Sequence, residues 1–157
     1  MYGSVIVLEC HSPGSQLESA DVFEVDRPMA ILALIIVFVG GAIGSMFRFW
    51  LSGFVAERFG ETFPSGTLAV NLVGSLIIGF AAAWLAHLSD AFLASGLKQF
   101  IVVGVCGGLT TFSSFSLQTW NLILDGRWGS AFTNIVVSTI LCLALVALGW
   151  NVGQRLW

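Results

Sequence analysis

Four long apolar stretches dominate this chain of 157 residues and limit what it can fold into. Each contains the roughly 20 consecutive apolar residues that a helix needs to cross a bilayer. Charged residues make up only 10% of the chain, against about 25% in typical soluble domains. The sequence therefore predicts an all-α membrane protein with four transmembrane helices in one domain. The expected spans are residues 30–54, 66–88, 97–124 and 128–152.

The first 29 residues differ in composition from these spans. They hold five of the nine acidic residues and lack the basic region and long apolar core of a signal peptide. Met29 stands directly before the first span. We expect residues 1–29 to be either a disordered tail or the product of an upstream start codon, with equal weight, and residues 30–157 to form the membrane domain.

One segment within the third stretch has an unusual composition for a membrane helix. Residues 104–115 read GVCGGLTTFSSF, which places glycines, hydroxyls and two phenylalanines at bilayer depth. Irregular backbone is tolerated there only where protein or a water-filled cavity surrounds it, and hydroxyl side chains can pair the backbone groups that a break frees. We therefore expect a break in the third helix and a site or pore beside it.

Positive charge is balanced across the expected membrane. An even number of spans places both termini on one side, so each side receives three of the six Lys and Arg residues. The two groups are Arg27, Lys98 and Arg155, and Arg48, Arg58 and Arg127. Because a bias in Lys and Arg normally fixes orientation, the tie predicts dual topology, with assembly as an antiparallel two-fold homodimer.

Glycines recur at the spacing that permits close helix packing. Three GxxxG pairs allow backbones to touch, and packing is the favoured interpretation of all three. The pairs are Gly40 and Gly44, Gly104 and Gly108, and Gly149 and Gly153.

The polar groups expected at bilayer depth are hydrogen-bond donors rather than acids. No Asp or Glu falls within the four spans, which disfavours proton-coupled transport and a cation-selective carboxylate ring. An enzyme is disfavoured because no acid or histidine lies at bilayer depth to act as a base for the hydroxyls. His87 lies at the end of the second span, near the membrane interface. Hydrogen-bond donors suit an anion. The donors expected at bilayer depth are Asn71, Thr110, Thr111, Ser113, Ser114, Asn134 and Ser138.

Asn134, Ser138 and Cys142 recur at intervals of four and therefore share one face of the fourth helix. This stripe predicts a polar track through the membrane. The alternative is hydrogen bonding between helices, worth about 0.6 kcal/mol for each group. For Asn71 alone the two interpretations carry equal weight.

Phe112 and Phe115 lie three residues apart, on one side of a helix. An aromatic ring has a positive edge and a negative face, so rings presented edge-on can contact an anion. Arg48 either adds positive potential at a vestibule or extends its guanidinium to the lipid headgroups.

Over residues 30–152 the chain resembles the CrcB/Fluc family of small fluoride channels. GGAIGSMFRF at residues 40–49 resembles the glycine and arginine motif of the family's first helix, and GTLAVNLVGS at 66–75 resembles its second-helix motif. GGLTTFSSFS at 107–116 resembles its third-helix break. The resemblance implies a passive fluoride-selective channel in the bacterial inner membrane, an antiparallel dual-topology homodimer with two fluoride pathways, and a structural sodium ion at the dimer interface.

The same resemblance implies roles for individual residues. The implied fluoride pathway comprises Asn71, Thr111, Phe112, Phe115, Asn134 and Ser138, with Arg48 at the vestibule. Gly107 and Thr110 match the positions whose backbone carbonyls hold sodium. There are two departures: Ser114 stands where a threonine is usual, and Gln118 stands where many members have a glutamate.

Two alternatives to a fluoride channel remain at this point. A small four-helix multidrug transporter should carry an intramembrane glutamate, which this chain lacks. A structural membrane protein would leave the third-helix break and the donor stripe unexplained. The expected partners are therefore fluoride, a second copy of the chain and membrane lipid, and no nucleic acid.

Overall fold

The chain folds as a bundle of long helices. The structure is a computed structural model and describes residues 27–60 and 62–156. Within these ranges four helical spans are long and apolar enough to cross a membrane, which confirms the predicted class. The expected tail lies outside the described residues except for residues 27–29, which form the start of the first helix. The elements are α1 (Arg27–Phe59), α2 (Ser65–Leu85), α3 (Ala91–Leu97), the π-helix η1 (Lys98–Cys106), α4 (Gly107–Leu109), α5 (Phe112–Leu124) and α6 (Trp128–Leu156).

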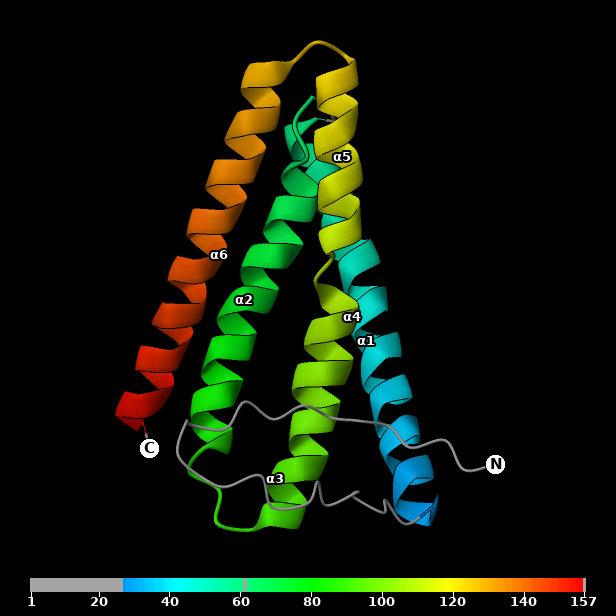
Figure 1. The fold of residues 1–157 in the computed structure, drawn as a ribbon, viewed down its shortest axis with the longest axis vertical. Helices are drawn as coiled ribbons and strands as arrows, with labels where there is room; N and C mark the ends of the chain where they lie inside the picture. The colour runs from blue at the N-terminus through cyan, green and yellow to red at the C-terminus, as the bar shows by residue number, and fades with distance from the viewer. Residues whose placement is uncertain (1–26, 61, 157) are drawn as a thin grey trace, which may run out of the picture.

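The third span consists of four consecutive elements, α3, η1, α4 and α5 (Figure 1). Asp90 begins it as an N-cap whose side chain accepts a hydrogen bond from the Leu93 N–H at 3.0 Å. After α4, Thr110 and Thr111 adopt extended backbone conformations, with φ/ψ of −81°/154° and −150°/109°. The helix resumes at Phe112. The predicted break within residues 104–115 is therefore confirmed, and it lies at these two threonines.

Glycines bring α1 into backbone contact with the third span. A Cβ added at Gly40 would lie 2.6 Å from the Phe100 carbonyl oxygen, and one added at Gly104 would lie 2.9 Å from the Gly40 Cα. A Cβ at Gly44 would collide with the Val105 carbonyl. These helices pack closely only because the positions have no side chain. Close packing is confirmed for these GxxxG positions.

The α2 and α6 helices form a second glycine-mediated pair. A Cβ at Gly149 would collide with the Leu76 carbonyl, and one at Gly153 would lie 2.6 Å from the Ala83 Cβ. The largest fully buried side chains are Val70, Cys106, Leu109 and Asn134. They come from α2, the end of η1, α4 and α6, so the core contains the elements that flank the break.

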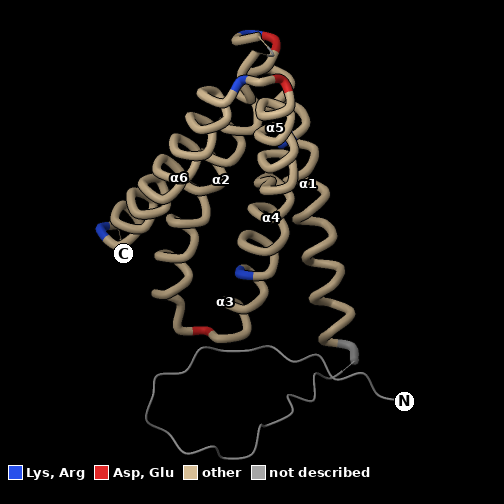
Figure 2. Tube along the Cα trace, turned by 45° about the horizontal axis from the view of Figure 1, so that its top comes forward, with Lys and Arg blue, Asp and Glu red and all other residues tan. Residues whose placement is uncertain are grey.

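Charged residues lie mainly toward the two ends of the bundle (Figure 2). The helices run up and down in alternation, so Lys98 and Arg155 lie toward the end where α1 begins and α6 finishes. Arg58 and Arg127 lie toward the opposite end, where α1 finishes and α6 begins. Arg48 lies deeper, within α1. In Figure 1, α1 and α6 diverge toward the end where α1 begins and α6 finishes.

Candidate functional site

Asn71 of α2 holds the break in the third span. The backbone N–H of Thr111 donates to Asn71 Oδ1 at 2.8 Å, and Asn71 Nδ2 donates to the Thr111 carbonyl at 3.3 Å. Nδ2 carries two hydrogens, so one remains for another acceptor. The structure therefore allows Asn71 both roles considered from the sequence, a link between helices and a donor beside the break.

Thr111 also caps the helix that follows the break. Its Oγ1 accepts a hydrogen bond from the Ser114 N–H at 3.1 Å and donates to Ser114 Oγ at 3.0 Å. A Ser or Thr oxygen bonded to an N–H of the first turn satisfies a donor that has no intrahelical partner. The side chain of Thr111 is 7% exposed, so water competes little for these bonds.

These two sets of hydrogen bonds change the environment of two carbonyl groups. In a continuous helix the Thr111 N–H would donate to the Gly107 carbonyl, and the Ser114 N–H to the Thr110 carbonyl. Here both N–H groups donate to side chains instead. The Gly107 and Thr110 oxygens are thus deprived of their usual donors, and free carbonyl oxygens are suitable ligands for a hard cation.

A cavity of about 410 Å³ lies beside the break, between α2, α5 and α6. It brings together five of the six residues implied for the pathway, and Cys142 also lines it. The five are Asn71, Thr111, Phe112, Phe115 and Ser138. Amide, hydroxyl and aromatic groups from three helices therefore converge on one space.

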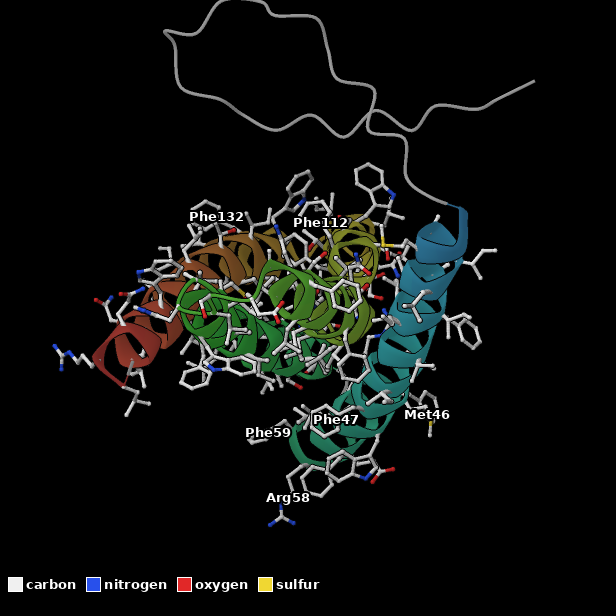
Figure 3. The ribbon with its side chains drawn as sticks, turned by 90° about the horizontal axis from the view of Figure 1, so that it is seen from below. Met46, Phe47, Arg58, Phe59, Phe112 and Phe132 are labelled. Atoms are coloured by element: carbon white, nitrogen blue, oxygen red, sulfur yellow. The ribbon has the colours of Figure 1, made fainter. Side chains whose placement is uncertain are left out.

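The two phenylalanines form a tilted pair at this cavity. Their ring centroids lie 5.4 Å apart with an interplanar angle of 42°. Phe115 is partly buried, whereas Phe112 is 79% exposed. Figure 3 shows Phe112 on the same side of the molecule as Phe132, pointing outward. The cavity is therefore open on one side in the single chain.

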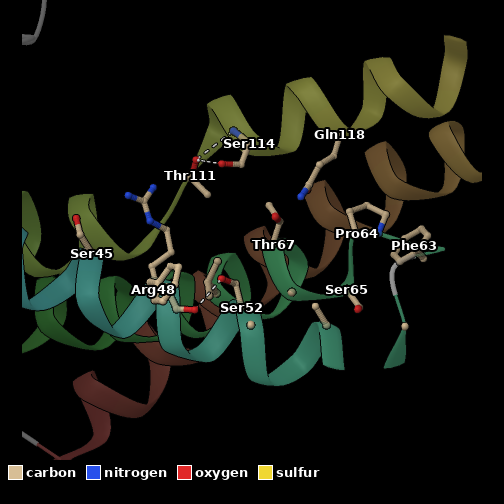
Figure 4. Close-up of a pocket in the computed structure, with 16 residues that line it drawn as sticks. Ser45, Arg48, Ser52, Phe63, Pro64, Ser65, Thr67, Thr111, Ser114 and Gln118 are labelled. Atoms are coloured by element: carbon tan, nitrogen blue, oxygen red, sulfur yellow. Dashed lines mark hydrogen bonds between the residues drawn. The ribbon is translucent and has the colours of Figure 1, made fainter. Parts of the chain in front are cut away.

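A second cavity, of about 570 Å³, lies between α1, α2 and α5 (Figure 4). Arg48 lines it together with Thr67, Ser114 and Gln118, so the predicted vestibule arginine does face a polar space. Thr111 lines this cavity and the first one. The helix break consequently lies between a space with a guanidinium and a space with two aromatic rings.

Asn134 occupies a different position from the other pathway candidates. It is 2% exposed, and it is not among the residues that line these two cavities. Its Nδ2 donates to Thr119 Oγ1 of α5 at 2.8 Å, and its Oδ1 accepts from Ser138 Oγ at 3.3 Å. Thr119 was not singled out from the sequence. The sequence signal that could have identified Thr119 is its position four residues after Phe115.

Fold and site define a class: a small four-helix membrane protein whose broken third helix lies between two cavities. The chain belongs to the family described as CrcB-like protein, Camphor Resistance (CrcB), whose model matches residues 35–150. The family recognised from the three sequence motifs is therefore confirmed.

Relatives with high identity span most of the chain. The fluoride-specific ion channel FluC of Opitutus terrae is 55% identical over 113 residues, 72% of this chain and 86% of that protein. FluC 4 of Brucella abortus is 49% identical over 129 residues, 82% of this chain and 96% of that protein. FluC of Rhodospirillum rubrum is 46% identical over 125 residues, 80% of this chain and 96% of that protein.

Proposed function

We propose that this protein is a fluoride-selective passive ion channel. The observation that carries the proposal is the cavity at the helix break, where Asn71, Thr111 and Ser138 face two phenylalanine rings, in a chain whose relatives are named fluoride-specific ion channels. Fluoride is small and strongly hydrated, so a pore has to replace its water with donors. Amide, hydroxyl and positive ring edges in a narrow path supply them stepwise.

The pathway runs from the cavity that Arg48 lines, past Thr111, to the cavity of the two rings. The guanidinium raises the local concentration of anions at the first cavity. Selectivity against chloride follows from the size of the ion and the geometry of the donors. Because Phe112 and Phe115 present weakly polar edges rather than full charges, the ion is held loosely enough to leave again.

The biological role is export of fluoride from bacteria across the inner membrane. Neutral hydrofluoric acid crosses a bilayer and dissociates in the less acidic cytoplasm, which traps the anion. A membrane potential contributes about 2.3 kcal/mol per charge for each 100 mV, and a negative interior drives fluoride outward. Passive flow therefore lowers the toxic concentration without enzymatic turnover.

The working form is an antiparallel dual-topology homodimer. Two observations support it: the even division of Lys and Arg between the two sides, and the 79% exposure of Phe112 at the open side of the ring cavity. A second copy in the inverse orientation covers that side and creates two equivalent pathways. An ion passing the rings is then shielded from lipid.

A sodium ion at the two-fold axis is the proposed structural cofactor. The Gly107 and Thr110 carbonyl oxygens would hold it, and their support is the loss of their usual helical donors to Asn71 and to the Thr111 side chain. Bound to these oxygens, the cation would supply positive charge at the break and would help to hold the two copies together. Among the residues that the structure describes, no cluster of acidic, histidine or cysteine side chains competes for this role.

Fluoride efflux from vesicles that contain the purified protein tests the proposed function. After valinomycin is added to potassium-loaded vesicles, a fluoride electrode should record rapid release, and a chloride electrode should record none. The same assay with sodium replaced by N-methyl-D-glucamine on both sides should show reduced fluoride release. Release of both anions would exclude a selective channel, release of neither would exclude a fluoride channel, and full release without sodium would exclude the structural cation.

Labelling of Lys98, the single lysine in the chain, tests dual topology. We expect an impermeant amine reagent to modify Lys98 in about half of the copies in intact spheroplasts, because both orientations coexist. The double variant Lys98→Arg and Arg127→Lys moves the amine to the opposite end and should also be half modified. Full labelling of one protein and none of the other would show a single orientation.

A further inference from the structure

Three buried hydroxyl and amide side chains form a hydrogen-bonded chain behind the ring cavity. Thr119 Oγ1 donates to the Phe115 carbonyl at 2.7 Å, Asn134 Nδ2 donates to Thr119 Oγ1 at 2.8 Å, and Ser138 Oγ donates to Asn134 Oδ1 at 3.3 Å. Thr119, Asn134 and Ser138 are 7%, 2% and 7% exposed. Water does not compete at such burial, so the groups themselves determine the direction of each bond.

Ser138 is the member of this hydrogen-bonded series that lines the cavity. A hydroxyl has one hydrogen to donate and two lone pairs. In the structure that hydrogen goes to Asn134 Oδ1, which leaves lone pairs for the cavity. An anion needs the hydrogen instead. In this arrangement Ser138 is therefore a poor partner for fluoride.

A half-turn of the Asn134 side-chain amide reverses the direction of these hydrogen bonds. Rotation about the bond between Cβ and the amide carbon is soft and roughly two-fold, and it exchanges the positions of Nδ2 and Oδ1. Nδ2 then donates to Ser138 Oγ, and Oδ1 accepts from the Thr119 hydroxyl, which gives up its bond to the Phe115 carbonyl. That carbonyl keeps the helical backbone N–H of Thr119 as its donor, so every group stays paired and no proton changes its heavy atom. The Ser138 hydrogen is released toward the cavity.

We infer that Asn134 is a positioning residue that sets whether the Ser138 hydroxyl presents its hydrogen or its lone pairs to the passing ion. The inference rests on the proposed fluoride pathway. Asparagine suits the role because one planar group carries both a donor and an acceptor. The same rotation assists the release of fluoride. When the Asn134 amide turns back, the Ser138 hydrogen returns to Asn134 Oδ1 and no longer faces the ion.

Asn134→Leu removes the amide at similar size and leaves Thr119 bonded to the Phe115 carbonyl. The Ser138 hydroxyl then donates to the backbone carbonyl four residues earlier, as buried hydroxyls on helices do. Hydroxyls elsewhere in this protein already behave in this way, for example Thr139, which donates to the Ile135 carbonyl at 2.7 Å. The leucine variant thus fixes Ser138 in the non-donating state without leaving a buried group unpaired.

Fluoride efflux from vesicles is measured for Asn134→Leu, Ser138→Ala and the double variant. We expect each single variant to lower the rate about tenfold, equivalent to about 1.4 kcal/mol. The double variant should be no slower than the slower single one, because Asn134 acts through Ser138. Asn151→Leu is the matched control, since Asn151 is exposed on the same helix and bonds only to its own Ala147 carbonyl.

A structural role for Asn134 would give a different pattern from a positioning role. Independent damage to the packing of α5 on α6 would multiply the two losses in the double variant, and this result would overturn the inference. Wild-type efflux from Asn134→Leu would overturn it as well. Absence of fluoride efflux from the unmodified protein would instead contradict the proposed function, so the two failures are distinguishable.

Discussion

Replacement of Phe112 by isoleucine is expected to reduce fluoride efflux to the level of protein-free vesicles while leaving the dimer intact. Isoleucine retains apolar bulk, but it has no ring and therefore no positive edge for an anion. Phe112 lines the cavity at the break and pairs with Phe115 at a centroid distance of 5.4 Å. Efflux is followed with a fluoride electrode after addition of valinomycin, and size-exclusion chromatography monitors assembly.

Phe132→Ile provides the control for this experiment. Phe132 is 68% exposed and lies on the same side of the molecule as Phe112 (Figure 3), but it belongs to α6 and is not among the residues that line the ring cavity. We expect its replacement to leave efflux unchanged. Undiminished efflux from Phe112→Ile, or equal losses from both variants, would show that the Phe112 ring serves packing and not the ion.

The position of the break could be predicted from the sequence, but the hydrogen bonds that join it to Asn71 could not. Glycines and hydroxyls at bilayer depth are local signals, and they located the irregular backbone to within a few residues of Thr110 and Thr111. Asn71 lies 40 residues away from Thr111 in the chain. A hydrogen bond over that separation depends on how α2 packs beside the third span, which composition does not encode.

The beginning of the third span shows two other limits of sequence interpretation. The expected start at residue 97 missed α3, although Asp90 before an apolar run is a recognisable N-cap signal. The π-helix of residues 98–106 had no such signal. A turn closed five residues apart uses the same apolar side chains as an α-helix, so only the packed structure distinguishes the two.

The donor stripe on the fourth helix was correctly identified as one face, but its members have different surroundings. A period of four assigns Asn134, Ser138 and Cys142 to one side of α6. It does not say which neighbour covers each residue. Thr119 of α5 covers Asn134, whereas Ser138 and Cys142 reach the cavity. Asn134 therefore links two helices, while Ser138 and Cys142 remain candidates for the polar track.

Replacement of Asn71 by leucine is expected to abolish fluoride efflux and to destabilise the fold. Leucine leaves the N–H and the carbonyl of Thr111 without the partners that Asn71 provides, and a buried group left unpaired costs about 1–3 kcal/mol. The released N–H can recover a partner by donating to the Gly107 carbonyl, as in a continuous helix. That change closes the break and occupies an oxygen proposed to hold sodium.

Efflux and thermal unfolding are measured in parallel for Asn71→Leu, in sodium and in N-methyl-D-glucamine solutions. We expect the variant to lose efflux in both solutions and to lose the stabilisation by sodium that the unmodified protein should show, since the cation is held at the break. Asn151→Leu, the same substitution at an exposed position, should behave as wild type. A variant that kept rapid fluoride efflux would prove that the pathway does not need Asn71, either as a donor or as the brace of the break.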